Sequence, residues 1–237
     1  MKLIICLITY NRLGYTKRTL RSLFNTIELP YFLIVVDNAS SDGTPEYLKS
    51  LKKRGRIDGL ILNSKNYYPG RACNMGWSRA SQDYPQATHL MRLDNDMHFE
   101  KGWDKRAEEY FDNIDRLGQL GLDFDGGENK TPQYYNGMGL IEWPGCVGGP
   151  NIIRRTIFET GARYDETPWE GSNSKLQEDS KFSRLLKSEG WLVGHMDERL
   201  SYTFANKDNW KDYPEYYIKT MTDRDYTENV DYLKGLE

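Results

Sequence analysis

Residues 3–12 read LIICLITYNR. The first six of these residues are an unbroken apolar run, and TYNR follows it at residues 9–12. Such a run is typical of a strand covered on both faces, as in a parallel sheet, whereas a strand with one solvated face alternates. The next segment places Leu20, Leu23 and Ile27 at helical spacing, which predicts a helix that packs back on this strand. The chain therefore begins as an α/β fold.

The alternation of strands and helices continues to about residue 96. Strands are predicted at residues 32–36, 57–62 and 88–93. One helix is predicted to begin after Thr44, which is its expected cap, and another is predicted at residues 71–82. This order predicts an open, mostly parallel central sheet with helices on both faces. Ligands bind beyond the carboxyl ends of the strands in such sheets, and the residues at these ends are Thr9, Asp37, Asn63 and Asp94.

The second half of the chain has a less regular pattern. Helices are predicted at residues 104–117, 152–160 and 180–188, an extended segment at 191–196, and loops with a short strand or two at 118–150. The tail from residue 205 is polar and rich in tyrosine, and no period predicts its structure.

The composition excludes few partners. A net charge of -3 and a pI of about 5.8 give no global electrostatic reason to expect a polyanion. Cys6, Cys73 and Cys146 are odd in number and far apart, which argues against a disulfide framework and fits a reducing compartment. Because there is no apolar run of about 18 residues, we expect a cytoplasmic protein, with peripheral contact to the inner membrane face as the alternative.

Asp94, Asn95 and Asp96 follow the strand at residues 88–93. If the backbone stays extended, the two carboxylates fall on one side, where they can bind a hard divalent cation. A cation held there can bridge phosphate oxygens and stabilise the charge of a departing diphosphate. A loop with solvated or capping aspartates has the same sequence pattern.

Two earlier segments are also candidates for ligand binding. Asp37 begins the turn-rich segment 37–44, which is either an Asx turn that leads to a helix cap or a contact for the edge of a nucleobase. Asn66 and Arg71 precede or open the helix at residues 71–82, where free N–H groups and a guanidinium suit a phosphate. A capped surface helix is the competing interpretation.

Glu178 and Asp179 begin the helix predicted at residues 180–188, where a carboxylate commonly acts only as a cap. Beside a sugar-nucleotide site, such a carboxylate can instead accept the proton of an attacking hydroxyl. His195 ends an apolar run and is either a nitrogen ligand for a metal or a structural histidine.

Several of these segments, in this order, resemble family 2 glycosyltransferases with the A-type fold. The segments that carry the resemblance over residues 2–196 are 8–12, 35–44, 66–76, 94–96, 149–155, 158–161, 164–166 and 178–179. The resemblance implies one Rossmann-like A-type domain over residues 1–204, divided into a nucleotide-binding half (1–97) and an acceptor and catalytic half (98–204). Residues 205–237 then form a C-terminal extension.

The resemblance also implies residue roles. The nucleotide-sugar donor would contact Thr9, Asn11, Arg12, Asp37, Asn66, Arg71, Asp94 and Asn95. Asp96 and Asp94 would bind Mn²⁺ or Mg²⁺, with His195 at the position of a further metal ligand in some relatives. Asp179 falls where the family keeps its catalytic base, and Trp143 and Glu178 are candidates for the acceptor side.

The chain departs from the processive members of the family. It lacks their membrane-spanning tail, and no Gln-x-x-Arg-Trp motif follows Asp179. We therefore expect transfer of a single sugar, with inversion, from a nucleoside-diphosphate donor to a hydroxyl of a glycan, lipid carrier, protein or modified nucleobase. UDP is the favoured nucleotide by analogy with the family.

Two other functions are compatible with parts of the sequence. A nucleotidyltransferase that makes a sugar nucleotide uses a similar sheet and metal, but residues 9–14 do not resemble its glycine-rich loop. A non-catalytic module that binds a sugar nucleotide or a glycan would show no donor turnover and would tolerate loss of Asp179.

Overall fold

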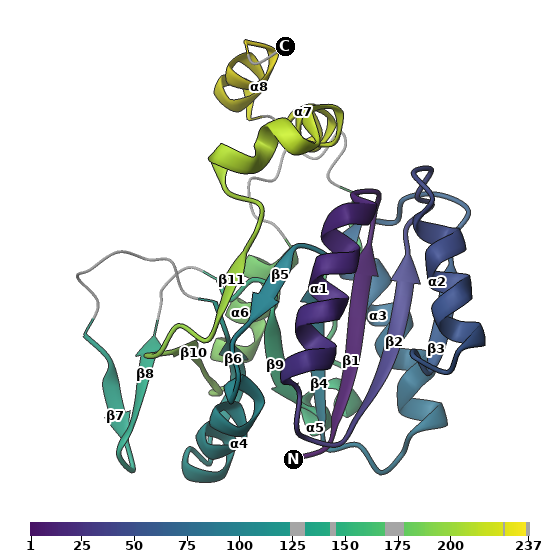
Figure 1. Cartoon of the computed structure of the whole chain (residues 1–237). Coiled ribbons are helices and arrows are strands. Elements are labelled where there is room, and N and C mark those ends of the chain that lie inside the picture. Colours follow the sequence, from purple (N-terminus) through teal and green to yellow (C-terminus); the bar gives the residue numbers. More distant parts are fainter. Residues whose placement is uncertain (124–130, 143–145, 169–177, 225, 236–237) are drawn as a thin grey trace.

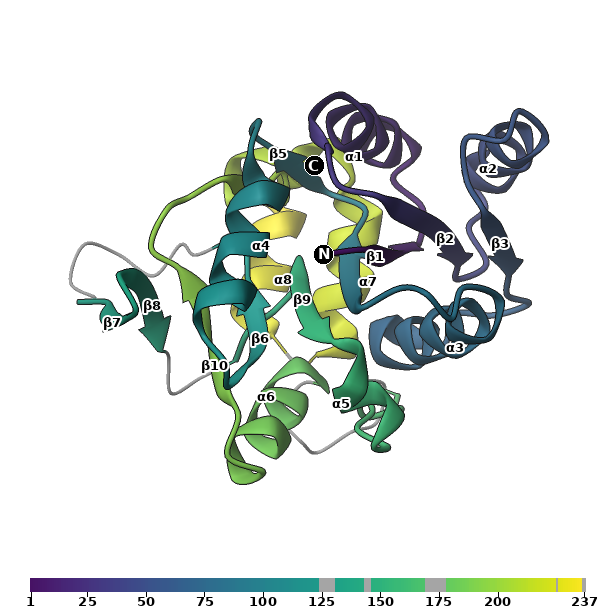
Figure 2. The same ribbon diagram turned by 90° about the horizontal axis from the view of Figure 1, so that it is seen from below.

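The computed structural model describes residues 1–123, 131–142, 146–168, 178–224 and 226–235. A central mixed sheet separates two layers of helices, which Figure 2 shows on opposite sides of it. Side chains of α1 (Leu13–Thr26), α2 (Thr44–Lys53) and α4 (Trp103–Asn113) belong to one core cluster. Side chains of α3 (Tyr68–Asp83), α5 (Arg155–Glu159) and α6 (Glu178–Ser188) belong to the other. The predicted α/β fold with helices on both faces is confirmed.

The first strand, β1 (Leu3–Thr9), shows why its run of apolar residues is unbroken. Leu3, Ile5 and Leu7 point into the core beneath α1 and α2, because side chains alternate along a strand. Ile4 and Cys6 point into the core beneath α3. Both faces of β1 are dry, and an interruption by a polar side chain would bury that group without water.

Sheet order places β1 beside β2 (Tyr31–Asp37) and β4 (His89–Asp94), with β3 (Gly59–Leu62) at the edge beyond β2. These four strands are parallel to one another. Thr9 pairs with Asp37, and Ile8 pairs with Asp94, so the polar strand ends lie at the same edge of the sheet. The N-terminal half therefore has the predicted parallel order.

The other half of the sheet mixes strand directions. It continues through β9 (Asn151–Arg154), β6 (Leu117–Gly121), β10 (Leu192–Met196), β8 (Met138–Glu142) and β7 (Gln133–Tyr135). β9 is antiparallel to β4 and β6, and β8 is antiparallel to β10 and β7, whereas β6 and β10 are parallel.

The helix predicted at residues 152–160 is wrong in its first part. Asn151–Arg154 form a strand that inserts between β4 and β6, and only Arg155–Glu159 are helical. Ile152 and Ile153 are β-branched and completely buried, one on each face of the sheet, which is a strand environment.

Two helix boundaries also differ from the prediction. The helix predicted at residues 104–117 ends at Asn113, and Leu117 already begins β6. Thr44 does not cap α2, because Gly43 is the cap residue and Asp42 Oδ1 accepts hydrogen bonds from the Thr44 N–H (3.2 Å) and hydroxyl (2.6 Å). Asp42 thus forms an Asx turn with Thr44 at the start of α2, and a glycine takes the cap position itself.

The tail forms a helical unit at the end of the sheet toward which β1 and β2 point (Figure 1). A short strand, β11 (Ser201–Thr203), pairs with β5 (Met97–Phe99) directly after the acidic residues of β4. The chain then continues through a 3₁₀ helix (Lys207–Asp212), α7 (Pro214–Asp223) and α8 (Thr227–Lys234). Trp210, Tyr217 and Leu233 form a separate small core there. No helix in the described part of the chain is long and apolar enough to span a membrane.

Gly76 sets how closely α3 approaches the sheet. A Cβ at this position would lie 2.3 Å from Cys6 Sγ and 3.0 Å from Val36 Cγ2. We expect Gly76→Ala to lower the free energy of unfolding by about 1–3 kcal/mol, because a packed interior yields little to an added methyl group. Urea unfolding checks this, with Ser78→Ala on the exposed side of α3 as the control. Equal stability of the two variants would contradict this account of the contact.

Candidate active site

A cavity of about 240 Å³ lies beyond the carboxyl ends of β1 and β4. From the sheet side it is lined by Arg12, Asn66, Arg92, Asp94, Asn95 and Asp96, among others. Tyr216, Tyr217, Met221 and Arg224 of the C-terminal unit line it from the other side. The cavity therefore lies where ligands bind in this architecture, and the tail supplies one of its walls.

Asp94 faces a pair of glycines. A Cβ on Gly149 would lie 2.6 Å from Asp94 Oδ2, so only glycine leaves room for this carboxylate. Asp94 Oδ1 is 3.4 Å from Arg92 Nε, because residues two apart on a strand point the same way. Arg92 is buried, and its Nη2 donates to Glu178 Oε1 at 3.2 Å. Arg92 thus joins the end of β4 to the start of α6.

Asp179 lies against Gly148, the neighbour of Gly149. A Cβ on Gly148 would be 3.5 Å from Asp179 Oδ2. Asp94 and Asp179 therefore lie against the same pair of adjacent glycines, although they are far apart in sequence. Burial raises the pKa of Asp179, the negative charge of Glu178 raises it further, and the positive charge of Arg92 lowers it. The net shift is upward, so this carboxylate holds a proton more tightly than an exposed aspartate does.

Asp96 is paired with Arg12. Arg12 Nη1 donates to Asp96 Oδ2 at 2.8 Å, and Nη2 donates to Asn95 Oδ1 at 2.6 Å. The Arg12 side chain has only 5% of its surface exposed and that of Asp96 12%, so this ion pair is largely shielded from water. The backbone of Arg12 is left-handed with φ 57°, and this loop conformation precedes α1.

The same guanidinium holds the C-terminal unit. Arg12 Cζ is 4.0 Å from the centre of the Tyr216 ring, and Nη1 lies 3.3 Å from the Tyr217 hydroxyl. Close to this contact, the Tyr15 hydroxyl donates to Asp212 Oδ2 at 2.9 Å. Arg12 therefore connects the acidic residues of β4 to α7 through one side chain.

The structure brings Thr9, Asn11 and Asp37 together. Their side chains are hydrogen-bonded to one another or to the loop that follows β2. Asp37 is 1% exposed, and its carboxylate accepts from the Thr9 hydroxyl (2.7 Å), the Ser40 hydroxyl (2.5 Å) and the Ser40 N–H (2.9 Å). Asn11 Oδ1 accepts from the Ser41 N–H at 2.8 Å. The Asp37 carboxylate binds the Ser40 N–H three residues on, so the Asx turn of this segment is the one at Asp42, whose Oδ1 accepts from the Thr44 N–H at the start of α2. A contact of Asp37 with a nucleobase remains a prediction.

Asn66 lines the cavity, whereas Arg71 is not among its lining residues. Arg71 lies with its Nε 3.8 Å from Glu166 Oε2 and its guanidinium 4.5 Å from the Tyr67 ring centre. Nearly half of its side-chain surface is exposed, so it can turn toward a ligand. Its contact with a diphosphate remains a prediction.

Asn74 holds α3 to the loop after α5. Its amide donates to Tyr164 O (2.9 Å) and Glu166 Oε1 (3.0 Å), and its Oδ1 accepts from the Tyr164 N–H (3.1 Å). A Cβ on Gly70 would lie 2.4 Å from Asp165 O and 3.1 Å from Glu178 Cβ. These two residues of α3 therefore fix the loop at residues 164–166 and the start of α6 beside the cavity.

The structure does not gather the predicted metal ligands into one cluster. Within the described ranges, no group of three or more His, Cys, Asp or Glu side chains is arranged to hold a metal. His195 is buried on β10, where its ring packs against Gly121. Asp94 and Asp96 both line the cavity, and Trp143 lies outside the described residues.

Three features of the site were missed at the level of sequence. Arg92 could have been recognised as the single charged residue in the apolar strand 88–93, at a position that shares a face with Asp94. Gly148 and Gly149 could have been recognised as adjacent glycines that precede a strand. Tyr216 and Tyr217 gave no comparable signal, because their contact with Arg12 depends on how the tail folds back.

The sequence model of Glycosyl transferase family 2 matches residues 4–161. No curated protein sequence matches the chain. The mannosyltransferase PcManGT from Pyrobaculum calidifontis, in complex with GDP-Man and Mn²⁺, superimposes with a TM-score of 0.67 at 16% identity, covering 92% of this chain and 60% of that one. TarS from S. aureus gives 0.63 at 18% identity, with 92% and 38% covered.

A shorter form of S. aureus TarS, residues 1–349 in complex with UDP-GlcNAc, gives a TM-score of 0.62 at 17% identity, with 93% of this chain and 64% of that one covered. The chain thus spans less than two thirds of the length of each of these structures. At these identities the likeness establishes the fold, which is that of A-type glycosyltransferases. Because the family match covers more than half of the sequence, the chain belongs to glycosyl transferase family 2.

Proposed function

We propose that the protein transfers one sugar from a nucleoside-diphosphate donor, with UDP as the favoured nucleotide, to a hydroxyl acceptor with inversion at the anomeric carbon. The observation that carries this proposal is the position of Asp94 and Asp179 against adjacent glycines beside the cavity. In this proposal Asp94 serves the donor end of the site and Asp179 serves the acceptor.

In this proposal Asp179 is the general base. Its raised pKa suits the removal of a proton from an acceptor hydroxyl, since a stronger base is a better proton acceptor. Arg92 holds Glu178 and Asp94 in place, and thereby positions the start of α6 relative to the donor. Glu178 and Trp143 are assigned to the acceptor side, and Thr9, Asn11, Asp37, Asn66 and Arg71 to the donor.

The oxygen ligands at the end of β4 fit a hard divalent cation. Asp94 and Asp96 offer carboxylate oxygens, which Mg²⁺ and Mn²⁺ prefer, and Mg²⁺ is commonly held by one or two carboxylates together with substrate phosphates and water. Two protein ligands are therefore enough, and His195 is not required. A cation bound there would supply neutralisation of the charge on the departing diphosphate.

A thermal-shift screen of nucleotide sugars with and without Mn²⁺ tests the donor. Both UDP-sugars and GDP-sugars belong in it, because TarS is in complex with UDP-GlcNAc and PcManGT with GDP-Man. We expect the melting temperature to rise when the correct donor and Mn²⁺ are present together. At a ligand concentration 100-fold above Kd, binding adds about 2.7 kcal/mol to the free energy of unfolding. Asp96→Asn should remove the Mn²⁺-dependent part of the shift.

The products identify the reaction. Release of nucleoside diphosphate that depends on an acceptor supports sugar transfer, and NMR of the product reports the anomeric configuration. Release of pyrophosphate from a nucleoside triphosphate and a sugar phosphate would instead show a nucleotidyltransferase. Binding of a sugar nucleotide without any turnover, across a panel of acceptors, would indicate a binding module.

A further inference from the structure

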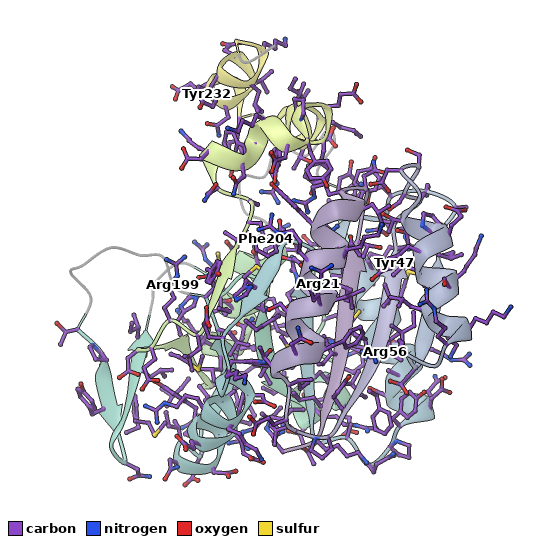
Figure 3. The ribbon with its side chains drawn as sticks, in the orientation of Figure 1. Arg21, Tyr47, Arg56, Arg199, Phe204 and Tyr232 are labelled. Atoms are coloured by element: carbon purple, nitrogen blue, oxygen red, sulfur yellow. The ribbon has the colours of Figure 1, made fainter. Side chains whose placement is uncertain are left out.

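A second concave site lies between α1 and α2, on the side of the molecule that Figure 3 shows facing the reader. Its volume is about 660 Å³, and it shares no lining residue with the cavity at the strand ends. The residues that line it are Lys17, Arg21, Phe24, Asn25, Tyr47, Leu51, Arg54 and Arg56. We call this site the α1–α2 groove.

The groove is cationic and has no acidic counterpart. Four of its lining residues are Lys or Arg, and none is Asp or Glu. In the part of the chain that the structure describes, no ion pair joins any of these four cations to a carboxylate. The nearby Asp58 accepts instead from the Leu33 N–H at 2.8 Å. In a protein of net charge -3, this is a local concentration of positive charge.

The helix geometry directs these charges toward one another. Lys17 and Arg21 are four residues apart on α1 and so project from the same face. On the other side, α2 ends at Lys53 and is followed by Gly55 at φ 65°, and the Arg56 N–H donates to Leu51 O at 3.0 Å. This left-handed turn reverses the chain after α2, so that the Arg56 guanidinium lies 4.5 Å from the ring centre of Phe24 on α1.

Tyr47 lies at the centre of the positive charge. Lys17 Nζ is 5.3 Å from its ring centre. Burial raises the pKa of Tyr47, and the charges of Arg54, Arg21 and Arg56, which line the groove with it, each lower this pKa. Figure 3 shows Arg21, Tyr47 and Arg56 on the face formed by α1 and α2.

The dipole of α2 explains only part of this cluster. Cations near the carboxyl end of a helix are favourable, and Lys52, Lys53 and Arg54 lie there. Lys17 and Arg21 lie within α1, far from the end of α2 in sequence, and no helix terminus accounts for their direction. A ligand that brings negative charge into the groove does account for it, since it would relieve the repulsion among the cations.

We propose that the α1–α2 groove is a binding site for a ligand that carries two or more negative charges on phosphate groups. Its rim of guanidinium and ammonium groups matches phosphate oxygens, and arginine binds them through two parallel hydrogen bonds. Phe24, Tyr47 and Leu51 form an apolar lining for the part of the ligand that carries the phosphates. The proposal is independent of the sugar-transfer reaction.

Two probes test this on the full chain. Inorganic pyrophosphate is titrated by calorimetry in EDTA, and vesicles of phosphatidylglycerol in phosphatidylcholine are used in cosedimentation. The groove variant combines Arg21→Gln, Arg54→Gln and Arg56→Gln, all at exposed positions. The matched control combines Arg79→Gln, Lys101→Gln and Lys234→Gln, which are exposed residues outside the groove and change the net charge equally.

We expect the groove variant to bind at least one probe about 100-fold more weakly than the unchanged protein, because each cation near an anionic surface contributes roughly a factor of five. The control should lose far less. Weaker binding of pyrophosphate alone identifies a soluble phosphorylated ligand, and weaker binding of vesicles alone identifies a lipid headgroup. Thermal unfolding of each variant, and the single variant Arg21→Gln, separate loss of binding from loss of fold.

Equal losses in the groove variant and the control would overturn the proposal, since net charge would then be a sufficient cause. Failure of the unchanged protein to bind either probe at low ionic strength would overturn it as well. Binding through this groove should also weaken steeply as salt increases, because its cations are exposed and are screened by ions.

Discussion

Replacing Asp179 with Asn is expected to reduce kcat by about 10²–10⁴-fold, the range that a positioned general base contributes. Asparagine has the size of aspartate but cannot accept the proton of an acceptor hydroxyl. The donor-dependent thermal shift should survive, because Asp179 does not line the cavity that we propose for the donor. Steady-state kinetics and the thermal-shift assay on one preparation measure both effects.

The same substitution should leave the fold at least as stable as before. The pKa of Asp179 is raised by burial and by Glu178, so the folded state holds this proton more tightly than the unfolded chain does. The stability that this proton contributes is complete below the unfolded pKa of about 3.9 and is lost as the pH rises through the folded pKa. Asparagine is neutral throughout and avoids that loss.

Asp165→Asn provides the control for the Asp179 experiment. Asp165 pairs with Lys181 of α6, and its carboxylate also accepts a hydrogen bond from the Thr167 hydroxyl at 2.8 Å. The control should keep most of the transfer activity. If Asp179→Asn retained full activity, or if it lost donor binding together with activity, Asp179 would not be the general base.

Arg12→Ala is expected to lower the free energy of unfolding by about 3 kcal/mol in the absence of divalent cations, or roughly 6–12 °C in Tm for a chain of this size. The substitution leaves the largely buried Asp96 carboxylate without the Arg12 cation that now lies 2.8 Å away. It also removes the stacking partner of Tyr216 and a hydrogen-bond donor to Tyr217.

Mn²⁺ should restore part of this loss, since a cation at Asp96 would supply the missing positive charge. The matched control is Arg18→Ala, because Arg18 lies close to Arg12 in the first half of α1 and its guanidinium lies 3.8 Å from the Phe204 ring centre at the start of the tail, but it is exposed. We expect a loss below about 1 kcal/mol for the control and no response to Mn²⁺. Calorimetric unfolding with and without Mn²⁺ separates the two. A variant Arg12→Ala as stable as the unchanged protein would show that Arg12 does not stabilise Asp96.

The first half of the fold was readable because its information is local. The unbroken apolar run at residues 3–8 and the periodic leucines of α1 each specify one element, and chain order then specifies a parallel sheet. The strand Asn151–Arg154 was misread because a short apolar run does not distinguish a buried strand from a helix. Its identity depends on β4 and β6, which lie on either side of it and are distant in sequence.

The site was readable to the extent that its residues lie at strand and helix ends. Asp94, Asp96 and Asp179 follow from such positions together with the family resemblance. The partners of these residues were not readable, because Arg12 reaches Asp96 and Tyr217 only after a loop and the tail have met. His195 is buried against Gly121, a neighbour that only the pairing of β10 with β6 reveals.

The attachment of the tail to β4 has a consequence for biosynthesis. The Phe204 N–H donates to Asp96 O at 2.6 Å, and β11 pairs with β5, so the covering helices are anchored beside the acidic residues. A ribosome releases Asp94 and Asp96 long before it releases α7. The nascent sheet can therefore form with its acidic residues still uncovered, and the cavity at the strand ends is closed only when Tyr216 and Tyr217 emerge and pack on Arg12.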